Sequence, residues 1–109
     1  MSRSLGTFEQ IVLLALIRLG GSAYSAPLVR EIEERSGRSV SAARVYIALR
    51  RLEERGLVLS RKQEPAPGEG GRGRRTFRAS PRAVREVERT RRTLERFWEG
   101  LTPSWAKGR

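Results

Sequence analysis

Apolar residues recur at helical spacing in four segments, which glycine, proline and serine separate from one another. In the first segment, Thr7 and Gln10 form a capping-box pattern that predicts a helix from Phe8 to about Leu19. Apolar side chains cover almost its whole circumference. We therefore expect this helix to be buried on several sides, partly in a contact between subunits.

The next two segments predict a helix-turn-helix arrangement. Ser25 is a suitable N-cap for a second helix, which ends near Ser36. Ser41 is a suitable N-cap for a third helix, which runs to about Arg55 and stops at Gly56. The apolar stripe of the third helix must pack on other elements and consists of Val45, Leu49 and Leu52. Two helices with so short a connection are typical of this motif.

Two extended runs after the third helix predict a β-hairpin. Residues 57–63 and 74–79 have the composition of strands. Residues 64–73 between them are too rich in proline and glycine to hold regular structure. The predicted fold class is therefore mainly α with a small β-hairpin, a winged helix-turn-helix followed by one more helix.

That last helix is expected from Arg82 to about Gly100, with Ser80 as its cap and Pro81 in its first turn. Its apolar residues are spaced 3, 7, 4 and 3 and form a heptad seam: Val84, Val87, Leu94, Trp98 and Leu101. So regular a seam, with Phe97 beside Trp98, favours dimerisation through this helix. An intramolecular cover is one alternative, and stacking of Trp98 and Trp105 on an aromatic effector is another.

Composition narrows the possible functions. The chain has 109 residues, enough for one domain, and carries 23 Lys+Arg against 12 Asp+Glu, a net charge of +11. This imbalance favours a polyanionic partner, although a GC-rich genome would also enrich arginine. With no cysteine and no histidine, disulfides, zinc fingers, thiol catalysis and histidine acid–base chemistry are excluded.

No sequence pattern of an enzyme is visible either. There is no Gly-x-Ser-x-Gly, no phosphate-binding loop and no metal-ligand spacing, so we expect no catalytic activity, no cofactor and no metal. The longest apolar run, residues 11–17, is too short to span a bilayer, and no secretory signal is present. We expect a cytoplasmic protein without membrane contact.

The positive charge is concentrated on the predicted hairpin. Residues 61–78 hold six basic and two acidic groups, a net charge of +4, whereas residues 1–40 reach only +1. A basic hairpin beside a basic helix is an arrangement that grips duplex DNA. The expected DNA contacts are Ser41, Ala42, Ala43, Arg44, Tyr46, Arg50 and Arg51 on the third helix and Arg72, Arg74 and Arg75 on the hairpin.

Two alternatives remain open for these residues. The hairpin arginines would also serve as solubilising charges that discourage aggregation at a strand edge, and glycine-rich basic loops also occur in RNA-binding segments. Tyr46 lies next to the apolar seam, so it is either a boundary residue that packs sideways or a hydroxyl contact to phosphate.

Several short motifs resemble the PadR family of bacterial transcriptional regulators over about residues 5–100. They are Leu5-Gly6-Thr7-Phe8-Glu9-Gln10, Val45-Tyr46, Leu49, Arg51-Leu52-Glu53, Gly56-Leu57-Val58, Gly70-Gly71-Arg72 and Arg75-Thr76-Phe77-Arg78. The resemblance implies a winged helix-turn-helix dimer, usually a repressor, that binds operator DNA with two-fold symmetry. It also implies that Tyr46 and the hairpin arginines contact the DNA backbone. The chain departs from the family at Tyr24-Ser25, where Tyr-Gly is common, and at the start of the last helix.

The resemblance further implies that the first and last helices build the dimer. The expected interface residues are Leu5, Phe8, Val12, Val87, Leu94, Phe97, Trp98 and Leu101. The expected layout is a DNA-binding domain over residues 1–80, a dimerisation helix over 81–101 and a loose tail over 102–109. The alternative is a winged-helix module that binds RNA or another protein. The sequence leaves the operator and any small-molecule effector open.

Overall fold

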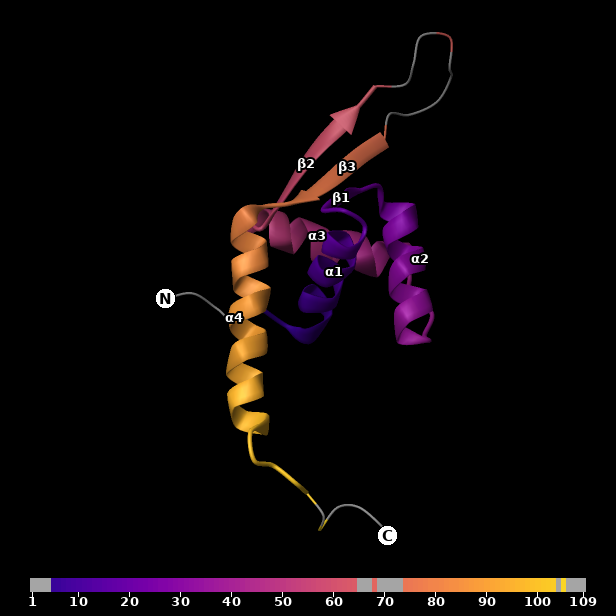
Figure 1. The fold of residues 1–109 in the computed structure, drawn as a ribbon. Coiled ribbons are helices and arrows are strands. Elements are labelled where there is room, and N and C mark those ends of the chain that lie inside the picture. The colour runs from indigo at the N-terminus through magenta and orange to yellow at the C-terminus, as the bar shows by residue number, and fades with distance from the viewer. Residues whose placement is uncertain (1–4, 65–67, 69–73, 104, 106–109) are drawn as a thin grey trace.

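The helices and the hairpin follow one another in the predicted order, with one additional short strand (Figure 1). A computed structural model gives the structure of residues 5–64, 68, 74–103 and 105. Over this part of the chain the elements are α1 (Thr7–Arg18), β1 (Ser22–Ala23), α2 (Ser25–Ser36), α3 (Ala42–Glu54), β2 (Val58–Gln63), β3 (Arg74–Ala79) and α4 (Pro81–Trp98).

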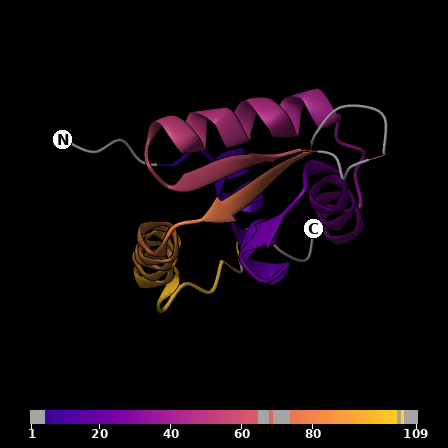
Figure 2. The same ribbon diagram turned by 90° about the horizontal axis from the view of Figure 1, so that it is seen from above.

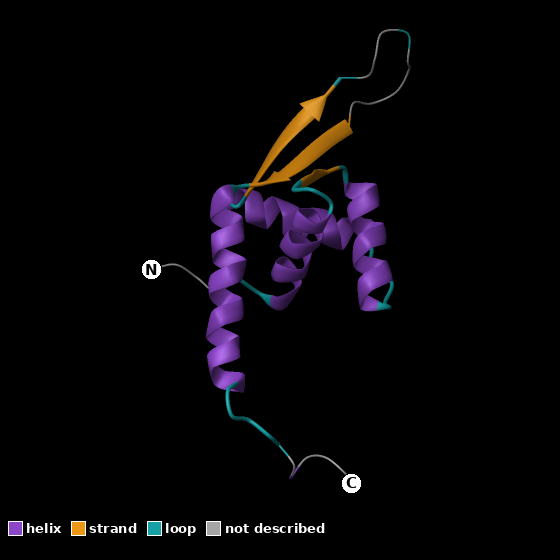
Figure 3. Ribbon diagram, viewed as in Figure 1, coloured by secondary structure: helices purple, strands orange, loops and turns teal. Residues whose placement is uncertain are grey.

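The strands form one antiparallel sheet in the order β1-β3-β2, with the helices grouped on one side of it (Figure 3). The pairing of β2 with β3 runs from Val58 opposite Ala79 to Gln63 opposite Arg74. The additional strand, β1, pairs with the other edge of β3 over two residues. Seen from above, α3 lies along the hairpin (Figure 2).

The caps of the helices agree with the sequence in two cases, Ser41 and Ser80, and differ by one residue in the other two. Ser41 caps α3, as predicted, and its Oγ accepts a hydrogen bond of 3.0 Å from the backbone N–H of Arg44. The cap of α1 is Gly6 rather than Thr7, and the Gly6 N–H donates to the Glu9 carboxylate over 3.3 Å. The cap of α2 is Tyr24, so Ser25 is already helical.

The core is formed by apolar side chains from α1, α2, α3 and the sheet, together with the first turns of α4. Its buried residues are Leu5, Val12, Leu13, Ala15, Leu16, Leu28, Ile32, Val45, Ala48, Leu49, Leu52, Leu57, Val58, Phe77, Ala83 and Val87. The predicted stripe of α3 is thus fully buried. The sequence predicts Leu5, Val12 and Val87 between subunits, whereas in the structure the three side chains are buried in the core of the protomer.

A single residue, Ser80, joins the sheet to α4. Its hydroxyl donates to the carbonyl of Gly56 over 3.1 Å and accepts from the backbone N–H of Ala83 over 3.3 Å, while its N–H donates to the Leu57 carbonyl over 3.0 Å. The buried serine therefore caps α4 and fixes it to the end of α3. The buried residues of α4 are Ala83 and Val87, and its C-terminal end extends away from the body of the protein (Figure 1).

Candidate nucleic-acid interface

Outside its buried seam, α3 presents a ridge and two flanks. At 100° per residue the ridge opposite the core consists of Ala43, Ile47, Arg50 and Glu54. Tyr46 and Glu53 lie on the flank towards the hairpin, and Arg44 and Arg51 lie on the flank towards α1. All of the expected DNA contacts on this helix are exposed to solvent. Small and apolar side chains at its N-terminal end leave room for close approach to a groove.

The flank towards α1 is held by an aromatic contact. The Cζ atom of Arg44 lies 3.9 Å from the centre of the Phe8 ring, close enough for a cation–π interaction. The sequence predicts Phe8 at the subunit interface, and the structure places its ring beside Arg44, an expected DNA contact. Arg44 and Arg51 line a cleft of about 560 Å³ between α3 and the start of α1.

Tyr46 meets the sheet with one edge of its ring. The ring centres of Tyr46 and Phe77 are 6.2 Å apart and the planes are inclined by 80°, an edge-to-face arrangement. The side chain is nevertheless 43% exposed. Of the two interpretations of Tyr46, sideways packing is therefore observed, and the exposed part of the residue is still free to meet a phosphate.

A chain of hydrogen bonds links α3 to the hairpin. Arg50 Nη1 donates to Glu53 Oε1 over 3.1 Å, and the Ser60 hydroxyl donates to Glu53 Oε2 over 2.6 Å. Arg75 Nη1 in turn donates to Ser60 Oγ over 3.0 Å. The sequence predicts Arg50 and Arg75 as DNA contacts, but no pattern in it indicates that Glu53 and Ser60 connect them.

Near the end of the hairpin strands, Arg74 lies against Tyr24. Its Cζ is 5.1 Å from the centre of the Tyr24 ring, and the Tyr24 hydroxyl donates to Gln63 Oε1 over 2.7 Å. Because Gln63 is opposite Arg74 in the sheet, the start of α2 supports both strands at once. Arg72, the third expected hairpin contact, lies outside the described residues.

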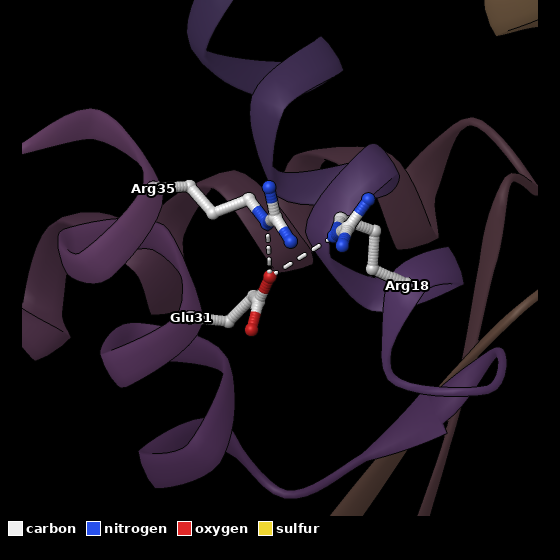
Figure 4. Close-up of polar contacts among 3 residues, drawn as sticks. All are labelled: Arg18, Glu31 and Arg35. Atoms are coloured by element: carbon white, nitrogen blue, oxygen red, sulfur yellow. Dashed lines mark hydrogen bonds and ion pairs between the residues drawn. The ribbon is translucent and has the colours of Figure 1, made fainter.

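On α1 and α2, Glu31 binds two arginines (Figure 4). Its Oε2 accepts from Arg35 Nε over 2.9 Å and from Arg18 Nε over 3.1 Å, which ties α2 to the end of α1. The hydrogen bond from Arg35 is the main reason that the pKa of Glu31 lies below its ordinary value of 4.5. Burial acts in the opposite direction, and Arg18 adds to the lowering.

Next to this cluster is a hollow of about 260 Å³ between α1 and α2. Its apolar lining comes from Ile11, Leu14, Ala15 and Ile32. Ile11 and Leu14 are 38% and 47% exposed, so one side of α1 is not covered by its own protomer. The expectation that α1 is buried on several sides is met only in part.

Within the described ranges, no group of three acidic, histidine or cysteine side chains is arranged to hold a metal ion. No helix there is long and apolar enough to cross a membrane. The exposed polar groups of α3 and the hairpin include guanidinium groups, the phenol of Tyr46 and the N–H groups at the start of α3, alongside the carboxylate of Glu54. The guanidinium, phenol and N–H groups bind phosphate oxygens and base edges.

Comparison with known proteins identifies the family. The pattern of the Transcriptional regulator PadR-like family matches residues 13–89. The chain belongs to this family. Members of the PadR-like family are DNA-binding transcription regulators, which agrees with the resemblance seen in the sequence. No curated protein matches the chain significantly.

Solved structures agree on the winged-helix fold. A PadR family transcriptional regulator from Eggerthella lenta superimposes with a TM-score of 0.68 at 23% identity, covering 91% of this chain and 84% of that one. F93 from STIV, a winged-helix DNA-binding protein, gives 0.67 at 16% identity, covering 92% of this chain and 100% of that one. BpsR from Bordetella bronchiseptica superimposes with a TM-score of 0.62 at 22% identity, covering 93% of this chain and 70% of that one. At these identities the likeness establishes the fold.

Proposed function

We propose that this PadR-like protein is a homodimeric transcriptional repressor that binds operator DNA with α3 and the hairpin of each protomer. The observation that carries the proposal is the exposed ridge of α3, flanked by Arg44 and Arg51 on one side and by the arginine-bearing hairpin on the other. A ridge of this width enters a major groove, while the hairpin follows the neighbouring backbone.

The contacts divide into two kinds. Ser41 and the N–H groups that begin α3 face phosphate, as do Arg44, Arg51 and the Tyr46 hydroxyl. Arg50 stands on the ridge and reaches base edges. The hairpin arginines, Arg72, Arg74 and Arg75, contact the sugar-phosphate backbone, and they add affinity with little sequence preference.

Dimerisation is proposed through the free end of α4. The exposed apolar residues there are Leu94, Phe97 and Trp98 of α4 and Leu101 just after its end, with exposed fractions from 54% to 75%. An apolar surface of this kind on a projecting helix is unfavourable in water and marks a contact with another chain. A second copy supplies both a matching helix and the uncovered side of α1, where Ile11 and Leu14 line the apolar hollow.

In this proposal residues 1–80 form the DNA-binding domain, and residues 81–101, which are α4 and the three residues after it, form the dimerisation segment. Repression follows when the dimer occupies an operator that overlaps a promoter. In BpsR, 6-hydroxynicotinic acid regulates DNA binding. For the present chain the exposed aromatic side chains of α4 offer a surface to an effector, whose identity the proposal leaves open.

The test is a titration of labelled genomic promoter DNA with the purified protein at rising salt. If each dimer neutralises several phosphates, affinity should fall roughly a thousandfold or more between 50 and 200 mM salt. A scrambled duplex of equal length is the control for sequence preference. In parallel titrations, single-stranded RNA and an acidic protein are added as competitors of the labelled DNA. A response that is flat in salt, or stronger binding to RNA or protein, would contradict the proposal.

A further inference from the structure

The hydrogen bonds around Glu53 join two arginines that stand on different elements. Glu53 Oε1 holds Arg50 of α3, and Glu53 Oε2 holds Ser60 of β2, which holds Arg75 of β3. Arg50 is exposed on the ridge, and Arg75 is half-buried beside the sheet. The network therefore spans the gap between the helix that enters a groove and the hairpin that follows the backbone.

Chemistry fixes the direction of every bond in the network. A guanidinium group only donates, so the one proton of the Ser60 hydroxyl is left for the carboxylate. The resulting O–H···O⁻ bond of 2.6 Å lies in the range of strong, charge-assisted hydrogen bonds. Because the donor and acceptor roles of Ser60 are both in use, a shift of Glu53 is transmitted to Arg75.

The hydrogen bonds that lead from Arg50 through Glu53 and Ser60 to Arg75 form a relay. The position of Ser60 in the sheet keeps this relay short. Ser60 is opposite Phe77 and Lys62 is opposite Arg75, so Ser60 and Arg75 are diagonal neighbours on one face. The same face carries Phe77, on which Tyr46 packs. On this face the hairpin meets the flank of α3 through the apolar contact of Phe77 with Tyr46 and through the polar relay, whose two ends are arginines.

The relay is not needed to hold the sheet on the helix. Val45, Leu49, Leu52, Leu57 and Phe77 are fully buried between these elements and provide that packing. Glu53 and Arg50 are both solvent-accessible, with side-chain exposures of 28% and 49%, and such surface pairs contribute little to stability. What the relay does is restrict where two cationic groups lie.

We propose that Glu53 and Ser60 are positioning residues that couple Arg50 and Arg75, so that groove contact by α3 and backbone contact by the hairpin reinforce each other. This rests on the proposed function, DNA binding by α3 and the hairpin. Loss of either arginine then releases part of the relay and weakens the contribution of the other. The two substitutions together should cost less affinity than the product of their separate effects.

A double-mutant cycle measured in two backgrounds tests the coupling. Dissociation constants for the tightest duplex selected from genomic fragments are measured for the parent, Arg50→Ala, Arg75→Ala and the double variant. The same four proteins are then made with Ser60→Ala. In the parent background we expect the product of the single losses to exceed the double loss by roughly threefold or more. With Ser60→Ala the two quantities should agree within about twofold.

Two further variants keep the result interpretable. Ser60→Thr retains the hydroxyl on a residue that suits a strand, and it should retain the coupling. Ser22→Ala removes an exposed sheet serine outside the relay, and it should also leave the coupling unchanged. Thermal unfolding of each protein confirms that the comparison is between folded molecules.

Each outcome has a distinct meaning. Coupling that is absent in the parent, or that persists after Ser60→Ala, overturns the positioning role, while the steep salt response still upholds DNA binding. A parent protein that binds no duplex at any salt overturns the proposed function and the positioning role together. Coupling between Arg50 and Arg75 that is present with serine or threonine at position 60 and lost with alanine there establishes the relay.

Discussion

The guanidinium of Arg44 lies over the ring of Phe8, with 3.9 Å between Cζ and the ring centre. One residue comes from the exposed flank of α3 and the other from the first turn of α1. The contact limits the freedom of a long cationic side chain before any DNA is bound. Phe8 therefore supports the proposed DNA-binding surface, although its sequence position suggested a role between subunits.

Replacing Phe8 by Leu should weaken DNA binding about two- to fivefold, because a cation–π contact at an exposed site contributes about 0.5–1 kcal/mol. The apolar volume is largely retained, so folding and dimerisation should change little. Phe8→Tyr keeps an aromatic ring and is the matched control. Fluorescence anisotropy with labelled duplex measures affinity, and light scattering measures mass. If Phe8→Leu dissociates the dimer, Phe8 belongs to the subunit interface, contrary to this prediction.

Replacing Trp98 by Ala should raise the dissociation constant of the proposed dimer by roughly tenfold or more, as expected for a large aromatic anchor. The protomer should remain folded, because Trp98 is 64% exposed and lies beyond the part of α4 that contributes to the core. Analytical ultracentrifugation over a range of concentrations provides the measurement.

Trp105 offers a control of identical chemistry on the same chain, since it is 86% exposed and follows the end of α4. Trp105→Ala should leave the dissociation constant unchanged. Equal effects of the two substitutions, or a parent protein that is monomeric throughout, would exclude α4 as the anchor of a dimer.

Replacing Ser80 by Ala should reduce the free energy of unfolding by about 1–2 kcal/mol. The change removes the N-cap of α4 and leaves the Gly56 carbonyl without its side-chain donor. Ser25→Ala is the comparison: the sequence pattern suggests a cap there, but the structure makes Ser25 the first helical residue of α2. Its effect should be much smaller. Urea denaturation of both variants measures the two free energies of unfolding. An equal loss for Ser25→Ala would show that Ser25 also acts as a helix cap.

The lowered pKa of Glu31 predicts a pH-dependent contribution to stability. The folded protein keeps this carboxylate ionised to a lower pH than the unfolded chain does. Its contribution is therefore fully present above the unfolded value of 4.5 and is lost as the pH falls through the lower folded-state pKa. The melting temperature of Glu31→Gln should be below that of the parent at neutral pH, and the two should converge as the pH falls below 4.5 and through the lower folded-state pKa.

Glu34→Gln, a change at an exposed glutamate of the same helix, controls for the general effect of removing a negative charge. Its melting temperature should show no comparable convergence. A constant difference between the parent and Glu31→Gln from neutral to acidic pH would show that the two arginines do not stabilise the ionised form.

Local signals in the sequence were sufficient for most of the fold. Ser41 as a cap, the apolar stripe at Val45, Leu49 and Leu52, and both hairpin strands depend on neighbours a few residues away, and the structure agrees with them. β1 was missed because two residues show no periodicity. The cap of α1 was misplaced by one position because Gly6 is followed by a threonine, which is itself a favourable cap.

The residues missed at the candidate site depend on contacts between distant parts of the chain. Tyr24 and Gln63 are 39 positions apart, and Arg75 and Ser60 are 15 apart. Likewise, helical spacing shows that Leu5, Val12 and Val87 must be covered, but it does not say whether by the same chain or by a second one. A pattern along one sequence records which face is apolar and leaves its partner undetermined.

Only Ser80 stands between the last strand of the sheet and α4, and its hydrogen bonds to Gly56, Leu57 and Ala83 make this junction stiff. In an assembly held through α4, the crossing angle of the paired helices would then fix how far apart the two hairpins stand. In such a dimer, that angle would also set the spacing between the two half-sites of an operator. A molecule wedged between the paired helices would change the spacing and release the DNA without touching any residue that binds it.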